Sequence, residues 1–154
     1  MTEPYVRKKI EKYLKKEGWS DNLQPLGLRS RGVDIKVKKE KPKEYGRYWL
    51  IEVKGDPGKK VKSPSGSRSS SFNSAVGQII TRMHTTRKRH KQGYHGYKYG
   101  VGFPSSFKKK VLNNLPFYVC EKLNLYVFFV NSHGKVEECG YRKIKKFQGK
   151  KSKN

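Results

Sequence analysis

Two acids and one lysine of this chain could together hold a divalent cation. Glu52 and Lys54 end an apolar run at residues 48–51, and Asp34 lies upstream within Gly32-Val33-Asp34-Ile35. Side chains two apart along a strand lie on the same face, so Glu52 and Lys54 are expected to point the same way. Carboxylate oxygens are the ligands that Mg²⁺ prefers, and a lysine beside them adds positive charge. The pattern indicates metal-assisted chemistry on a polyanion.

The acid-x-lysine spacing alone is a weak signal. It occurs twice, in Asp34-Ile35-Lys36 and in Glu52-Val53-Lys54, and roughly two occurrences are expected by chance in so lysine-rich a chain. The second has the more informative context, because it ends a run that is apolar on both faces and therefore central in a sheet. We place the candidate site at Asp34, Glu52 and Lys54.

The charge of the chain points to a polyanionic partner. Lys and Arg number 37 against 12 Asp and Glu, so the net charge is +25, and residues 57–120 hold thirteen Lys or Arg and no acid. Such a chain repels itself unless a polyanion neutralises it. Nucleic acid is the commonest, and an anionic membrane surface is the weaker alternative. Asp34 and Glu52 could also be plain counter-charges for lysines, although surface pairs of that kind contribute little stability.

The composition is that of one folded domain inside the cell. The 154 residues suffice for a single core, and no apolar segment reaches the length of about 18 residues that a membrane span requires. The polar N-terminal segment does not look like a signal peptide. Cys120 and Cys139 fit neither a disulfide framework nor a paired zinc motif, and the four histidines match no compact zinc site. We expect a cytoplasmic protein that does not contact membranes.

Hydrophobic periodicity predicts an α/β fold with a mixed central sheet flanked by helices, in the order αβββαβ. Residues 1–140 are expected to form the domain, with a flexible basic loop at 55–71, and residues 141–154 a disordered basic tail. Thr2 and Gly18 are expected to bound the first helix. Strands are expected near 22–28, 33–38, 48–54, 97–103 and 123–130, a second helix at 72–90, and a basic helix or turn at 104–115.

With these elements and motifs, the chain resembles the PD-(D/E)xK nuclease superfamily. That superfamily includes type II restriction enzymes, archaeal Holliday-junction resolvases and Mrr-like endonucleases. The chain resembles the resolvases and the Mrr-like endonucleases more than the restriction enzymes. The resemblance covers roughly residues 3–130 through element order, Gly32-Val33-Asp34-Ile35, Leu50-Ile51-Glu52-Val53-Lys54-Gly55 and the helix that contains Gln78. Val33 stands where the family has proline.

The resemblance implies a role for each candidate residue. Asp34 and Glu52 would bind Mg²⁺, which Mn²⁺ could replace, with the Val53 carbonyl as a further ligand. Lys54 would orient or deprotonate the attacking water. Many members carry a glutamate in the first helix, for which Glu3 and Glu11 are both candidates, and some carry a glutamine that Gln78 could match.

We therefore expect a Mg²⁺-dependent endonuclease that hydrolyses DNA, and the alternative is a non-catalytic DNA- or RNA-binding protein. A homodimer would be needed for branched DNA. Tyr94, Tyr97 and Tyr99 could stack on unpaired bases, but packing on the sheet is the better interpretation. The residues expected to contact nucleic acid are Lys36, Lys59, Lys60, Lys62, Arg68, Arg82, Arg87, Lys88 and Arg89.

Overall fold

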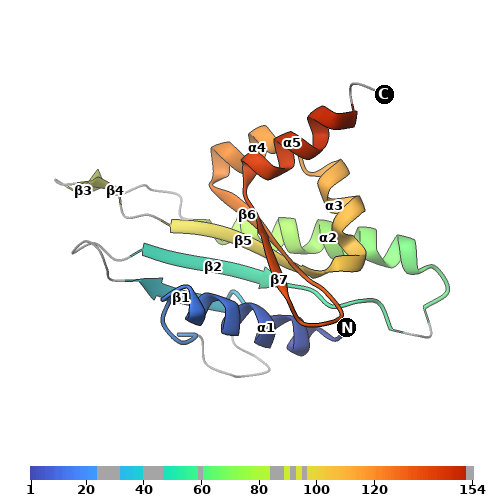
Figure 1. The fold of residues 1–154 in the computed structure, drawn as a ribbon, viewed down its shortest axis with the longest axis horizontal. Helices are drawn as coiled ribbons and strands as arrows, with labels where there is room; N and C mark the ends of the chain where they lie inside the picture. Colours follow the sequence, from blue (N-terminus) through green and yellow to red (C-terminus); the bar gives the residue numbers. More distant parts are fainter. Residues whose placement is uncertain are drawn as a thin grey trace.

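A computed structural model describes residues 1–23, 32–39, 47–58, 61–83, 89–90, 93–94 and 97–151. It shows a five-stranded mixed sheet in the order β1-β2-β5-β6-β7 with helices on both faces (Figure 1). The expected fold class is confirmed. The strands are β1 (Ile35–Lys39), β2 (Arg47–Val53), β5 (Tyr97–Pro104), β6 (Leu125–Val130) and β7 (Val136–Cys139). The short strands β3 (Arg89–His90) and β4 (Gly93–Tyr94) pair separately.

The helices are α1 (Glu3–Lys16), α2 (Pro64–Thr81), α3 (Lys108–Asn114), α4 (Phe117–Leu123) and α5 (Tyr141–Lys151), with a 3-10 turn, η1, at Ser105–Phe107. None of those that the structure describes is long and apolar enough to span a membrane.

The pairing of the strands places the end of β2 inside the molecule. β2 runs parallel to β5, and β5 runs parallel to β6, while β1 and β7 pair antiparallel at the two outer positions. Trp49, Ile51 and Val53 pack on one face of the sheet and Leu50 on the other, so β2 is buried on both faces as expected. Because parallel strands end at the same edge, the residues after β2 and those after β5 lie next to each other.

Helix α1 covers one face of the sheet. Val6, Ile10 and Leu14 recur every four residues, are buried and pack with β1 and β2. The helix approaches β5 closely at Gly102, where an added Cβ would lie 2.5 Å from the Ile10 Cδ1 atom. The helix begins after Thr2 as expected, although the Thr2 side chain makes no capping hydrogen bond, and Gly18 follows it with a φ of +80°.

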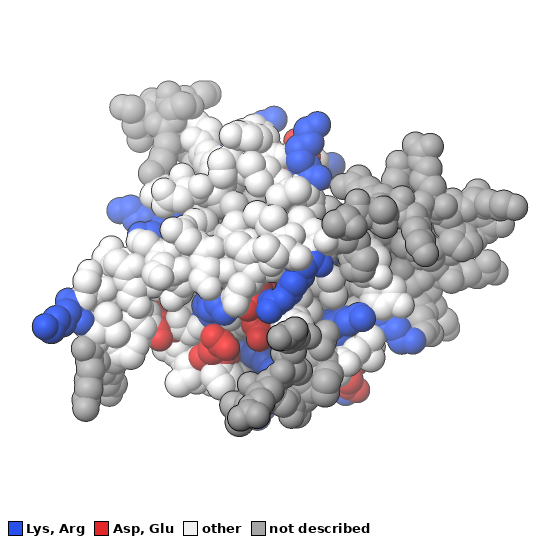
Figure 2. Space-filling view, turned by 180° about the vertical axis from the view of Figure 1, so that it is seen from behind, with Lys and Arg blue, Asp and Glu red and all other residues white. Residues whose placement is uncertain are grey.

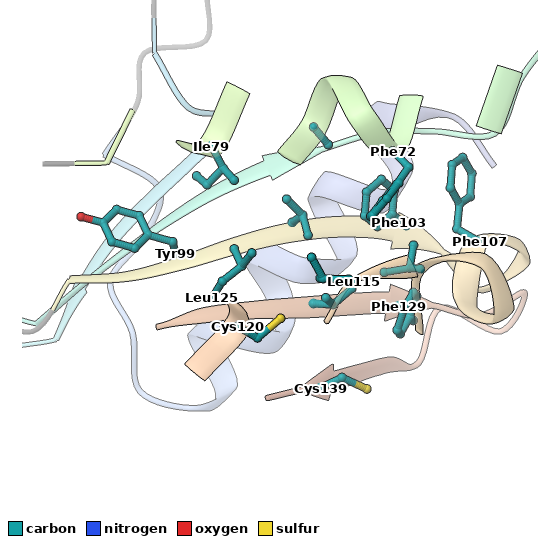
Figure 3. Close-up of a cluster of buried hydrophobic side chains, with 14 of the residues drawn as sticks. Phe72, Ile79, Tyr99, Phe103, Phe107, Leu115, Cys120, Leu125, Phe129 and Cys139 are labelled. Carbon is teal, nitrogen blue, oxygen red and sulfur yellow. The ribbon is translucent and has the colours of Figure 1, made fainter. Parts of the chain in front are cut away.

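The other face is covered by α2 together with α3, α4 and α5 (Figure 1), and Figure 3 shows buried side chains of the core on this face. Phe72, Ala75 and Ile79 form the buried side of α2, and the Phe72 ring lies 6.2 Å from that of Phe103 in β5. Both cysteines are free and buried in this core, and burial raises the pKa of the Cys120 thiol to about 12. Their burial agrees with the absence of a cysteine motif in the sequence.

Two of the expected boundaries around α2 are wrong. The helix begins at Pro64 and ends at Thr81, so residues 64–71 are not part of a loop and residues 82–83 are not helical. The Ser63 side chain accepts a hydrogen bond from the Gly66 N–H at 3.3 Å, and proline is favoured in the first helical turn. This Ser-Pro start was the missed signal, because the serine-rich composition resembles a loop.

The expected disordered tail is also wrong, because residues 141–151 form helix α5. Ile144 is fully buried, and Phe147 packs against the same core. The Gln148 amide donates to the carbonyls of Leu112 and Leu115, both at 2.9 Å. Tyr141, Ile144, Phe147 and Gln148 share one face of the helix, and this short stripe is masked in the sequence by lysines.

The remaining differences are smaller. Strand β6 begins at Leu125, preceded by α4, and β7 was not expected. Residues 104–115 contain η1 and α3, in agreement with a basic helix or turn. Of the strand expected near 22–28, residues 24–28 lie outside the described residues, and the Leu23 N–H donates to the Lys36 carbonyl at 2.7 Å.

Candidate active site

Glu52 is the one charged side chain that the structure describes as buried, with 3% of its surface exposed. It lies near the carboxyl end of β2, on the face that α2 covers, because Leu50 two residues earlier packs in the core beneath that helix. A charged group that leaves water requires partners, because burial of an unpaired carboxylate is costly. The structure supplies them from two elements.

Both oxygens of the Glu52 carboxylate accept hydrogen bonds from cations. Lys54 Nζ donates to Oε1 at 3.1 Å, which confirms that Glu52 and Lys54 point the same way. Arg82, in the turn after α2, donates from Nη1 to Oε2. The exposed fractions of the Lys54 and Arg82 side chains are 19% and 30%, so the cations lie between the buried carboxylate and solvent.

Asp34 lies beside the same strand end. Its Oδ2 atom accepts a hydrogen bond from the Val53 N–H at 2.6 Å. Because N–H and C=O of one strand residue point to the same edge, the Val53 carbonyl also faces the Asp34 side of β2. The adjacent Lys54 N–H points the other way and donates to the Gly102 carbonyl at 2.9 Å. Asp34, Glu52 and the Val53 carbonyl therefore flank one strand end.

The Asn22 side chain holds the Asp34 backbone in place. The Asn22 amide donates to the Asp34 carbonyl at 3.0 Å, and its oxygen accepts from the Lys36 N–H at 3.0 Å. Asn22 thereby fixes the backbone on both sides of Ile35, the first residue of β1. Asn22 was not among the expected site residues, because nothing in its sequence neighbourhood marks it in advance of the fold.

Burial and a neighbouring negative charge both act on Glu52. Burial raises the pKa of this carboxyl, and the charge of Asp34 raises it further, against the opposing effects of Lys54 and Arg82. The net direction is upward, with burial as the largest cause, and the contribution of Asp34 indicates that the two negative charges disfavour each other. A bound cation would relieve this repulsion.

Of the two glutamates considered in α1, Glu3 is the one that lies near this site. Burial raises the pKa of Glu3, Lys54 lowers it, and Asp34 raises it, which places Glu3 within electrostatic range of both. Glu11 is linked to the site indirectly, through the Asn22 amide, which also donates to the Asp34 carbonyl. It accepts hydrogen bonds from Arg7 Nε at 3.0 Å and from the Asn22 amide at 2.8 Å.

Gly55 explains how Glu3 comes close. A Cβ at Gly55 would lie 2.5 Å from the Glu3 backbone nitrogen and 2.9 Å from the Thr2 carbonyl carbon. The next residue, Asp56, donates its N–H to the Met1 carbonyl at 2.7 Å. The segment after Lys54 is thus packed against the first turn of α1, and only glycine permits this contact.

Helix α2 brings Arg82, and not Gln78, into contact with Glu52. The Gln78 side-chain oxygen accepts a hydrogen bond from the Ser74 hydroxyl at 3.5 Å, and this contact lies within α2. Arg82 occupies the position at which the buried stripe of Phe72, Ala75 and Ile79 would continue. From the sequence, Arg82 was expected only to contact nucleic acid. The signal for a second role was its spacing, which continues the buried stripe of α2 with a charged residue.

The other cations expected to bind nucleic acid have different surroundings. Arg68 Nε lies 3.8 Å from the Asp56 carboxylate, Lys36 Nζ lies 5.9 Å from the centre of the Tyr48 ring, and Lys62 is exposed. Figure 2 shows acidic side chains gathered in one area of the molecular surface, with Lys and Arg side chains next to them. Lys59, Lys60, Arg87, Lys88 and the side chain of Arg89 lie outside the described residues.

Tyr97 and Tyr99 pack on the sheet, as the sequence led us to expect. Tyr99 is buried, and the Tyr97 ring stacks on Tyr48 with centroids 5.2 Å apart. The side chain of Tyr94 lies outside the described residues.

The donor set at the end of β2 fits a hard divalent cation. Mg²⁺ binds through one or two carboxylates and keeps several waters. The carboxylates of Asp34 and Glu52 both flank this strand end, where the charge of Asp34 raises the pKa of Glu52. Among the residues that the structure describes, no three His, Cys, Asp or Glu side chains are arranged as a metal site. A cation at this position would rely on two carboxylates, the Val53 carbonyl and water.

Comparison with known proteins identifies the fold. No family model matches the chain, and no curated protein matches it. A similar solved structure is that of an XisH family protein from Nostoc punctiforme PCC 73102, with a TM-score of 0.53 and 16% identity over 88% of this chain and 98% of that one. Another is an fdxN element excision controlling factor protein from Anabaena variabilis, with a TM-score of 0.53 and 17% identity over 87% and 96%. At these identities, the similarity shows that the fold is shared over nearly the whole length of both proteins.

Proposed function

We propose that the protein is a Mg²⁺-dependent endonuclease that hydrolyses phosphodiester bonds in DNA. The observation that carries this proposal is the burial of Glu52 at the end of a central strand, beside Asp34 and hydrogen-bonded to Lys54. A counter-charge on the surface would need neither the burial nor the second carboxylate. Perturbed ionisable groups of this kind are typical of functional sites.

Each residue has a role in this proposal. Asp34, Glu52 and the Val53 carbonyl would hold the cation, and Glu3 would add a further carboxylate at the rim of the site. Bound Mg²⁺, or Mn²⁺ in its place, would neutralise phosphate charge and lower the pKa of a water. Lys54 would orient that water or take its proton, because its amine lies at the same strand end, 3.1 Å from the Glu52 carboxylate.

DNA is the substrate that the charge and the fold favour. A net charge of +25 is suited to a polyanion, and acids at a strand end that faces such a ligand serve no purpose in a simple binder. The name of the second structural neighbour, an excision controlling factor, is compatible with a DNA-acting role for this fold. We propose, on the arrangement of Asp34, Glu52 and Lys54 together with this fold, that the chain belongs to the PD-(D/E)xK superfamily.

A cleavage assay tests the proposal. Duplex, branched and single-stranded DNA are incubated with the protein and Mg²⁺ or Mn²⁺, and products are resolved on a denaturing gel. We expect cleavage of at least one substrate, and loss of it with a chelator or in Glu52→Gln, which keeps the shape of the side chain. The variant should still bind DNA when the chelator is present. Absence of product on every substrate would favour the non-catalytic binding protein instead.

A further inference from the structure

We propose that Arg82 competes with the divalent cation for Glu52 until nucleic acid binds, so that metal and nucleic acid bind cooperatively. This inference rests on the proposed function, since it concerns the same carboxylate. It assigns to Arg82 the role of a positioning residue that couples two ligands, which is distinct from general contact with phosphate.

The Glu52 carboxylate is already paired with two cations in the structure. Lys54 donates to Oε1 and Arg82 donates to Oε2, so both oxygens of a carboxylate that is 3% exposed already have a cationic partner. Lys54 follows Glu52 by two residues in the same segment, and its backbone is held there by the hydrogen bond to the Gly102 carbonyl. Arg82 reaches Glu52 from another element, so it is the partner that can leave.

Arg82 has a backbone that is held in place and a side chain that is partly exposed. Its N–H donates to the Ile79 carbonyl at 3.2 Å, which fixes its backbone at the end of α2, while its side chain remains 30% exposed. Arginine has a long side chain with several rotatable bonds. The guanidinium can therefore turn from the carboxylate towards solvent without any change in the helix.

Electrostatic repulsion would make Arg82 and a divalent cation compete for Glu52. A guanidinium and a divalent cation on one carboxylate repel each other, and the repulsion is stronger in a partly buried site than in water. A phosphate at the site accepts paired hydrogen bonds from arginine and attracts the metal as well. Arrival of nucleic acid would thus transfer Arg82 from Glu52 to the phosphate and free the oxygen for the metal.

Thermodynamic linkage then gives a measurable consequence. If nucleic acid raises the affinity for metal, metal must raise the affinity for nucleic acid by the same factor. Arg82 should be the source of much of this coupling. When Arg82 is replaced by glutamine, the Oε2 atom of Glu52 loses the guanidinium that competes with the metal.

Mn²⁺ binding to the whole chain tests this inference without any catalysis. Free Mn²⁺ is measured by electron paramagnetic resonance, with and without a short duplex of phosphorothioate DNA that resists cleavage. We expect Arg82→Gln to bind Mn²⁺ on the order of 10-fold more tightly than the wild type without DNA, a difference of about 1.4 kcal/mol. DNA should then increase its affinity less than it does for the wild type.

Two control variants separate charge from packing. Arg68→Gln removes an arginine of α2 that contacts Asp56 and not Glu52, and it should bind Mn²⁺ as the wild type does. Arg82→Lys keeps the charge and should remain near the wild-type affinity. Thermal unfolding confirms that each variant is folded before its Mn²⁺ affinity is compared.

The outcomes distinguish this inference from the proposed function. Arg82→Gln with a Mn²⁺ affinity equal to or weaker than that of the wild type overturns the inference, provided that the wild type binds Mn²⁺ and Glu52→Gln does not. An equal effect of DNA on both proteins also overturns it. If Glu52→Gln binds Mn²⁺ as tightly as the wild type, the metal is not at Glu52, and the proposed function fails together with the inference.

Discussion

The carboxylate of Asp34 accepts a hydrogen bond from the backbone N–H of Val53 at 2.6 Å. This contact joins the residue before β1 to the end of β2, and it holds the acid beside the strand that carries Glu52. Asp34 therefore has a structural partner as well as a proposed ligand role, and the two can be separated by mutation.

Substitution of Asp34 should show these two roles. Asp34→Ala leaves the Val53 N–H without its acceptor, and a buried donor that loses its partner costs about 1–3 kcal/mol. Asp34→Asn keeps an acceptor oxygen and removes the charge, so it should be the more stable variant. Urea unfolding measures the difference, and equal stability of the two variants would contradict the structural role. Both should lose Mg²⁺-dependent cleavage.

The raised pKa of Glu52 predicts a pH dependence of stability in metal-free buffer. Burial and the charge of Asp34 raise the pKa of this carboxyl above its ordinary value of 4.5. The folded state therefore favours the protonated form, and the stabilising contribution is complete below 4.5 and is lost as the pH rises through the folded-state pKa. Glu52→Gln has no such titration.

The free energies of unfolding of wild type and Glu52→Gln, measured with a chelator present, test this dependence. The wild type should lose stability relative to the variant as the pH rises from below 4.5 towards neutrality. Glu3, whose pKa is also raised, is present in both proteins and cancels in the comparison. A difference that stays constant with pH, or that changes in the opposite direction, would be evidence against the raised pKa.

Gly55→Ala should disturb the site through the first turn of α1. The new methyl group would lie 2.5 Å from the Glu3 nitrogen, so the strand exit or the helix must shift. Overpacking of this kind costs about 1–3 kcal/mol. Thermal unfolding checks this expectation, with Gly58→Ala as the control because an added Cβ there meets no atom within 4 Å. Equal melting temperatures for both variants would show that the close approach is not required.

Helix α5 should be necessary for the stability of the domain. Ile144 is fully buried, and truncation of a buried isoleucine to alanine costs about 2–5 kcal/mol. Lys146→Ala, at an exposed position of the same helix, should change stability by less than about 0.5 kcal/mol. Chemical denaturation of both variants provides the measurement. A disordered tail would make the two substitutions equally neutral.

Much of the fold could be predicted from the sequence, because the relevant patterns are local. The apolar spacing of Val6, Ile10 and Leu14 predicted α1, and the run before Glu52 predicted a strand buried on both faces. The contact between Glu52 and Lys54 also followed from alternation along one strand. In each case, the distance between the residues is fixed by the geometry of a single element.

The errors arose where local composition and tertiary packing disagree. Serines at 65–71 resemble a loop, yet the buried side of α2 at Phe72 and beyond stabilises the whole helix. Lysines at 143–151 resemble a disordered tail, yet Ile144 and Gln148 dock the helix onto α3 and α4. Packing energy that depends on a distant partner is absent from any local pattern.

The excess of positive charge, the two acids and the lysine, and the strand that carries Glu52 and leads into Lys54 can all be read from the amino-acid sequence. The groups from other elements that surround Glu52 depend on how the chain folds. The tertiary structure placed Glu3 near the site, and it brought Arg82 onto the carboxylate. These relations join residues that are 30 or more positions apart, and their distances are set by how α1 and α2 pack on opposite faces of the sheet.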